Sequence, residues 1–161
     1  MMIFVTTGTQ EPFDRLIIAI DEIAAHLPDV TFKVQAFAAT YKPKNFKLTN
    51  FFSPAEFETY VQQSQLIISH AGMGTIISAL VNSKPIIVMP RLMKYLEHRN
   101  EHQLATAKRL DGLKYVTVAY DAEELISTVL SSWPDNLKSL HKVGLQASEE
   151  LLDSLNNFIK Q

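Results

Sequence analysis

The feature that most constrains the fold is an alternation of two kinds of segment along the chain. Short apolar runs rich in β-branched residues recur, and the longer segments between them repeat their apolar residues with the 3.6-residue period of a helix. This alternation is typical of a parallel sheet built from strand–helix–strand units. Strands are expected at residues 2–6, 31–35, 47–52, 66–69, 85–89 and 115–119.

Helices with clear start signals separate the expected strands. The run IIVM at residues 86–89 carries no polar residue, which indicates that helices cover both faces of the sheet. Ser53 and Glu56 form a capping box with proline at the first helical position, and Asp121 with Glu124 repeats its acidic form. Helices are expected at residues 13–26, 54–63, 75–82, 100–110 and 122–131. We therefore predict an α/β fold with a Rossmann-like, doubly wound and mainly parallel sheet.

The length predicts one domain. A chain of 161 residues can bury one core but is too short for two substrate-sized domains. We expect residues 1–161 to form a single domain in which residues 135–161 are a helical C-terminal extension. The end of this extension, residues 147–159, is amphipathic. Its apolar stripe predicts packing on its own domain, docking of a partner chain, or a homodimer contact.

Composition excludes several classes of function. The net charge of -2 and the lack of a basic stripe argue against nucleic-acid binding. The chain has no cysteine, so disulfides, thiolate metal sites and a cysteine nucleophile are excluded. Neither a signal peptide nor an apolar run of about 20 residues is present, so we expect a soluble protein in the cytoplasm.

The strongest functional signal is the stretch LIISHAGMGTIISAL at residues 66–80. A buried strand is followed by Gly72 and Gly74, and a helix is expected to begin near Thr75. Glycines at such a turn let the backbone approach a ligand, and the free amides and positive dipole end of a helix suit a phosphate. The glycines could equally form only a tight turn. His70 ends the strand, where open α/β sheets bind ligands, although a core histidine is the alternative.

A second glycine turn, TTGT at residues 6–9, follows the first strand at the same edge of the sheet. Its amides and hydroxyls could hold another part of the same anion, or the turn could be only structural. Because Gly8 is followed by no second or third glycine, the turn does not match the dinucleotide-binding pattern. A nicotinamide oxidoreductase is therefore disfavoured.

The third candidate segment is the polar loop after the run IIVM, at residues 90–110. Glu97, His98, His102 and Gln103 can form hydrogen bonds to sugar hydroxyls or a ribose. The two histidines are four residues apart, but the sequence lacks the glutamate that directly follows the first histidine in zinc proteases. A solvated helix start is the remaining interpretation. We expect no metal and no cofactor.

Together these segments resemble the glycosyltransferase family 28 C-terminal domain, which is the donor half of the GT-B fold. The resemblance spans residues 2–110 and rests on the order of four pieces: IFVTTGTQEPFDRLI, ISHAGMGTI, KPIIVMPR and EHRNEHQ. The most similar branch contains stand-alone subunits of two-component transferases, which act in dolichol-linked oligosaccharide synthesis and in bacterial capsule and exopolysaccharide synthesis.

The resemblance implies a set of residues for each part of a UDP-sugar. Gly8 and Thr9 would line the diphosphate side of the cleft, and the uracil would lie near the strand end at Phe52. The polar pair His102 and Gln103 would hold sugar hydroxyls. The turn and helix start that hold the diphosphate would be His70, Gly72, Met73, Gly74 and Thr75. Arg91, Glu97 and His98 would be neighbours of the sugar-binding pair.

Two departures from the family pattern bear on function. Ser78 stands where relatives usually carry a glutamate bonded to the ribose. The alternatives are that Glu97 or Glu101 takes the place of this glutamate, or that hydroxyl contacts hold the ribose. A complete GT-B enzyme also has an acceptor domain, which we expect this chain of 161 residues not to contain.

The resemblance implies the donor-binding subunit of an inverting hexosyltransferase that uses a UDP-sugar and a lipid-linked acceptor. A membrane-anchored partner subunit would bind the acceptor and hold this chain at the membrane. The alternative is a non-enzymatic nucleotide-binding or regulatory subunit. The catalytic base is not identified.

Overall fold

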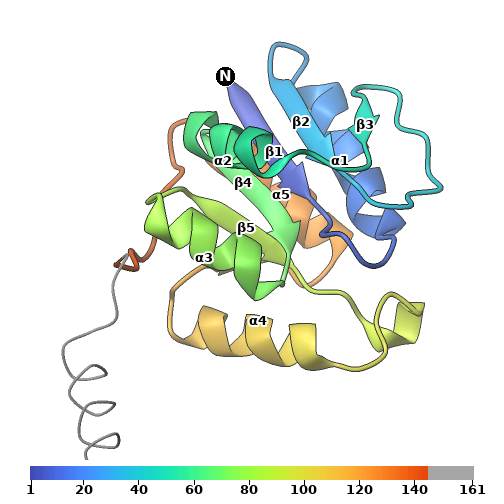
Figure 1. The fold of residues 1–161 in the computed structure, drawn as a ribbon. Coiled ribbons are helices and arrows are strands. Elements are labelled where there is room, and N and C mark those ends of the chain that lie inside the picture. Colours follow the sequence, from blue (N-terminus) through green and yellow to red (C-terminus); the bar gives the residue numbers. More distant parts are fainter. Residues whose placement is uncertain (145–161) are drawn as a thin grey trace, which may run out of the picture.

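The computed structural model describes residues 1–144, which form a six-stranded sheet with helices on both faces (Figure 1). All strand pairs are parallel and the strand order is β3-β2-β1-β4-β5-β6. The predicted doubly wound, Rossmann-like sheet is confirmed. The strands are β1 (Met2–Thr6), β2 (Thr31–Gln35), β3 (Leu48–Thr49), β4 (Leu66–His70), β5 (Ile86–Met89) and β6 (Thr117–Val118).

The helices fall into two layers. Helices α1 (Asp14–His26) and α5 (Ala122–Ser132) pack side by side on one face of the sheet. The opposite face is covered by α2 (Pro54–Gln63), α3 (Met73–Val81) and α4 (His102–Gly112) (Figure 1). A short 3-10 turn, η1 (Met93–Tyr95), lies between β5 and α4.

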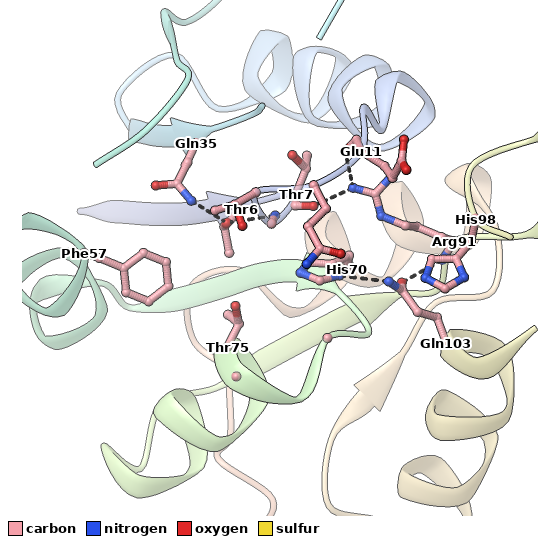
Figure 2. Close-up of a pocket in the computed structure, with 15 residues that line it drawn as sticks. Thr6, Thr7, Glu11, Gln35, Phe57, His70, Thr75, Arg91, His98 and Gln103 are labelled. Carbon is pink, nitrogen blue, oxygen red and sulfur yellow. Dashed lines mark hydrogen bonds between the residues drawn. The ribbon is translucent and has the colours of Figure 1, made fainter. Parts of the chain in front are cut away.

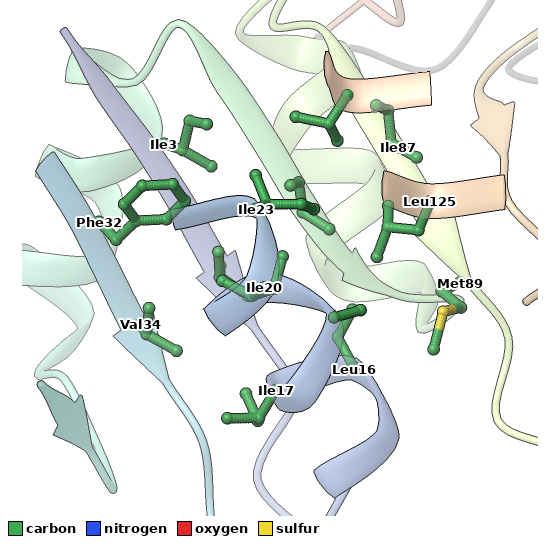
Figure 3. Close-up of a cluster of buried hydrophobic side chains, with 14 of the residues drawn as sticks. Ile3, Leu16, Ile17, Ile20, Ile23, Phe32, Val34, Ile87, Met89 and Leu125 are labelled. Atoms are coloured by element: carbon green, nitrogen blue, oxygen red, sulfur yellow. The ribbon is translucent and has the colours of Figure 1, made fainter. Parts of the chain in front are cut away.

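Central strands supply side chains to both hydrophobic layers. In β1, Ile3 and Val5 are buried against the α1 and α5 layer, whereas Phe4 is buried on the opposite face. Figure 3 shows the α1 and α5 layer, in which Leu16 and Ile20 of α1 lie over the sheet. Burial on both faces explains why these strands are apolar throughout.

Capping side chains define two helix starts as predicted. The Ser53 hydroxyl accepts from the Glu56 amide, and the Glu56 carboxylate accepts from the Ser53 amide at 2.8 Å, which completes the capping box of α2. Asp121 accepts from the Glu124 amide at 2.8 Å at the start of α5. The Glu124 carboxylate accepts from the amide of Tyr120 at 2.7 Å.

Several expected boundaries were wrong. The edge strands β3 and β6 have two residues each. An edge strand pairs on one side only, and at both places the backbone leaves the sheet after a short pairing. Helix α3 begins at Met73, two residues before the expected start at residue 75. Helix α4 begins at His102, after turns at residues 97–101 that the sequence pattern assigned in part to the helix.

The start of the expected helical extension is not helical. Residues 135–144 contain no helix, and the backbone amide of Val143 donates to Leu80 at the end of α3. The amphipathic segment at residues 147–159 lies outside the described residues. Among residues 1–144, no helix is both long and apolar enough to cross a membrane.

Candidate functional site

A cleft of about 410 Å³ opens at the carboxyl ends of the central strands. It lies where the chain order reverses between β1 and β4, the position at which open α/β sheets bind ligands. Figure 2 shows its side chains. The residues that line this cleft are Thr6, Thr7, Gly8, Thr9, Gln10, Glu11, Gln35, Phe57, His70, Gly72, Gly74, Thr75, Arg91, His98 and Gln103.

Two glycine turns close around the His70 imidazole. Gly8 has a φ of 82°, and a Cβ atom there would lie 2.7 Å from His70 Nε2. A Cβ atom at Gly72 would overlap His70 Cε1. Glycine is therefore required at both positions to admit the ring, because any larger residue would meet it. Two of the three segments singled out from the sequence thus meet at one side chain.

The third glycine of these turns has a different role. A Cβ atom at Gly74 would meet nothing within 4 Å, although Gly74 lines the cleft in the first turn of α3. The N-cap residue of this helix is Gly72, and no side chain within the described part of the chain caps the helix. The first amides of α3 therefore present free donors and the positive dipole end at the cleft, beside Thr75. This arrangement suits an anionic group.

His70 is held as an uncharged donor in this cleft. Burial, and next the charge of Arg91, lower the pKa of His70 to about 4, which leaves the ring neutral at physiological pH. The Gln103 side-chain amide lies 3.1 Å from Nδ1. A neutral imidazole in contact with an anion acts as a hydrogen-bond donor and not as a second cation.

Arg91 supplies a fixed positive charge behind the cleft. The side chain is buried, and its guanidinium donates to the backbone carbonyls of Thr7 and Glu11 at 2.6 Å each and to that of Pro12. It also lies 4.7 Å from the centre of the Phe13 ring. Burial lowers the pKa of Arg91 to about 10, so the group stays charged at neutral pH. Arg91 thereby ties the loop after β1 to the end of β5.

Sequence reasoning missed a polar side chain on the floor of the cleft. Gln35 ends β2 and is buried, and its Oε1 accepts from the Phe52 amide at 2.8 Å. Its Nε2 lies 3.4 Å from the Thr6 hydroxyl. Among residues 1–144, the buried Thr7 hydroxyl, which also lines the cleft, has no hydrogen-bond partner. The position of Gln35, a polar residue at the end of a buried strand, is the sequence feature that could have identified it.

Gln10, Glu11 and Phe57 also line the cleft and were not predicted.

Four predicted site residues do not line the cleft. Phe52 packs its ring 4.8 Å from that of Tyr60, and Met73 is exposed on α3. Glu97 forms a two-bonded ion pair with Arg15, at 2.8 Å for each bond. The side chain of His102 is exposed at the start of α4.

The remaining predicted residues come together in the cleft. They are Gly8, Thr9, His70, Gly72, Gly74, Thr75, Arg91, His98 and Gln103. Ser78 lies more than a turn inside α3 and does not line the cleft, and neither Glu97 nor Glu101 does so. Within residues 1–144, no three histidine or carboxylate side chains are placed to hold a metal ion.

Known proteins similar to this chain were found by sequence and by structure. The model of the glycosyltransferase family 28 C-terminal domain matches residues 2–156. The UDP-N-acetylglucosamine transferase subunit ALG13 of Cryptococcus neoformans is 32% identical over 105 residues, or 64% of this chain and 52% of that protein. ALG13 of Candida albicans is 33% identical over 87 residues, or 53% of this chain and 27% of that protein. The chain therefore spans about half or less of these relatives.

Solved structures agree on the fold. The solution structure of ALG13 superposes with a TM-score of 0.60 at 23% identity, over 96% of this chain and 94% of that chain. A UDP-GlcNAc 2-epimerase from Neisseria meningitidis, bound to UDP-GlcNAc, gives a TM-score of 0.60 at 18% identity, over 97% of this chain and 44% of that chain. With the match over residues 2–156, the chain belongs to the glycosyltransferase family 28 C-terminal domain family.

Proposed function

We propose that this chain is the donor-binding subunit of an inverting glycosyltransferase that uses a UDP-sugar. The observation that carries the proposal is the convergence of His70, Arg91 and the uncapped start of α3 on one cleft. These groups offer a neutral donor, a fixed positive charge and free backbone amides. That combination suits a diphosphate, whose negative charge increases when its bond to the sugar breaks.

Leaving-group stabilisation follows from this arrangement. In an inverting transfer, the acceptor hydroxyl attacks the anomeric carbon and gives its proton to a base on the partner, while the bond from that carbon to the diphosphate oxygen breaks. The electron pair of that bond goes to the diphosphate, and the amides at the start of α3 and the His70 ring donate to the developing charge. This chemistry requires no metal, since fixed protein dipoles and Arg91 supply the positive potential.

The donor's two ends are assigned by the polarity of the cleft walls. We assign the nucleoside to the side of Gln35 and Phe57, where an aromatic ring and a buried amide line the cleft. We assign the sugar to the side of His98, from which a second hollow of about 340 Å³ continues past Arg99 and Asn100. This hollow also takes in Gln10 and Glu11.

The acceptor and the catalytic base are assigned to a partner. The curated relatives carry the word subunit in their names and are UDP-N-acetylglucosamine transferase subunits, which supports an enzyme assembled from two chains. We propose a membrane-anchored partner that binds a lipid-linked sugar acceptor in glycan synthesis. By this account the isolated chain binds the donor but transfers no sugar at an appreciable rate.

Calorimetry on the purified chain tests the proposal. UDP, UDP-N-acetylglucosamine, UDP-glucose and ADP are titrated first in the presence of EDTA and then with magnesium. We expect the uridine compounds to bind in EDTA with unchanged affinity in magnesium. Failure of every uridine compound to bind would overturn the donor-site assignment. Binding that disappears in EDTA and returns with magnesium would overturn the metal-free mechanism.

A further inference from the structure

The side-chain amide of Gln103 joins the ends of two neighbouring strands. Its Oε1 lies 3.2 Å from the backbone amide nitrogen of Arg91, which follows β5. Its Nε2 lies 3.1 Å from Nδ1 of His70, the last residue of β4. Figure 2 shows the Gln103 side chain reaching the imidazole. Each end of the amide therefore has a protein partner.

These contacts fix the orientation of the amide and then the tautomer of the histidine. A backbone N–H can only donate, so the Gln103 oxygen must face Arg91. The amide nitrogen then faces His70, and because it too can only donate, Nδ1 must offer its lone pair. A neutral imidazole in this arrangement carries its single hydrogen on Nε2.

Nε2 of His70 lies between the two glycine turns. A Cβ atom at Gly8 or at Gly72 would lie 2.7 Å from Nε2 in either case. Both turns line the cleft with His70. The donor nitrogen of the ring therefore lies in the cleft between the turn after β1 and the turn that leads into α3.

We propose that Gln103 is a positioning residue that holds His70 in its Nε2–H tautomer and thereby aims a neutral donor at the ligand anion. The inference rests on the proposed diphosphate site. It differs from the contact with sugar hydroxyls that the resemblance implied for Gln103, because the amide acts on the ligand through His70. Loss of the amide should therefore weaken the binding of the nucleotide itself and not only the binding of its sugar.

The tautomer is measured by the imidazole nitrogen shifts of His70 in long-range ¹H–¹⁵N NMR spectra of the free protein. In the unsubstituted chain we expect a protonated Nε2 and an unprotonated Nδ1. Gln103→Glu replaces the donor by an acceptor, so we expect protonation of Nδ1. Gln103→Met removes the hydrogen bonds at nearly constant size, so we expect a mixture of tautomers. Gln62→Met, on the exposed face of α2, serves as the control and should leave His70 unchanged.

Calorimetry with the same variants separates positioning from sugar contact. We expect Gln103→Met to weaken the binding of UDP and of UDP-N-acetylglucosamine by the same factor, about twofold for an even mixture of tautomers, because only the Nε2–H form presents the donor. Nδ1–H in the unsubstituted chain, or an unchanged tautomer in both Gln103 variants, would overturn the proposal. So would weakening of the UDP-sugar alone. The tautomer readout needs no ligand, so failure of UDP to bind the unsubstituted chain contradicts the proposed function separately.

Discussion

The imidazole of His70 lies between two glycine turns and beside a buried guanidinium, and these surroundings determine its charge. Removal from water disfavours the protonated ring, and the Arg91 charge adds to this effect. The pKa of His70 falls to about 4, whereas the ordinary value is 6.5. In the unfolded chain the ring takes up a proton at a higher pH than it does in the folded protein.

This difference predicts how stability depends on pH. The contribution of His70 is fully present above about pH 6.5 and is lost as the pH falls toward 4, because the unfolded chain then binds the extra proton. Its size is roughly 3 kcal/mol for a shift of this extent. Urea unfolding between pH 7.5 and 4.5 measures it, with His70→Gln as the variant that removes the titrating group. If the free energy of unfolding depends on pH equally in the two proteins, the lowered pKa of His70 is contradicted.

Some side-chain contacts in the cleft could be predicted from the sequence and others could not. The proximity of Gly8, His70 and Gly72 could be expected, because the carboxyl ends of parallel strands share one edge of the sheet. The contacts of Gln35 could not, since they depend on the register that places the Phe52 amide beside it. Glu97 looked like a ligand-binding residue because its ion pair with Arg15, 82 residues earlier, leaves no local pattern.

Elements buried on both faces were predictable and edge elements were not. The bounds of β1, β2 and α2 agree with the sequence pattern, which reflects burial or a capping box. The pattern overestimated β3 and β6, whose outer residues continue as loops instead of pairing. It also placed the start of α3 two residues late. Met73 and Gly74 have the pattern of a glycine turn, although they are the first two residues of the helix.

The loop between β1 and α1 depends on a residue from a distant element. Arg91, just after β5, donates to three of the loop's backbone carbonyls, those of Thr7, Glu11 and Pro12. Removing the guanidinium leaves these carbonyls without their partner, which costs about 1 to 3 kcal/mol for a buried group. The loop also carries Gly8, so its displacement changes the cleft.

Arg91→Met should therefore lower the free energy of unfolding by about 2 to 4 kcal/mol and weaken UDP binding as well. Arg99→Met is the matched control, because Arg99 is exposed and its loss should change stability by less than about 0.5 kcal/mol. Urea unfolding and calorimetry measure the two effects. If the Arg91 and Arg99 variants are equally stable, the guanidinium does not hold the loop.

At the scale of the whole molecule, one sheet brings the β1 turn, the β4–α3 turn and the β5–α4 loop to a single edge. The strand order reverses there between β1 and β4, and the cleft opens at that position. Residues 1–144 thus form one sheet with helices over both faces (Figure 1), and the cleft lies at the edge of that sheet. We propose that a partner completes the enzyme at the open side of this cleft.

The most direct test of the central claim, that the start of α3 binds a diphosphate, is calorimetric titration of UDP into two glycine variants. Gly74→Val adds a side chain in the cleft, and Gly112→Val adds the same side chain at the end of α4. In both cases the new Cβ meets nothing within 4 Å among residues 1–144. Both variants should therefore fold. We predict that Gly74→Val weakens UDP binding by at least about tenfold, or 1.4 kcal/mol, while Gly112→Val binds normally. Normal UDP affinity in a folded Gly74→Val protein would contradict the account.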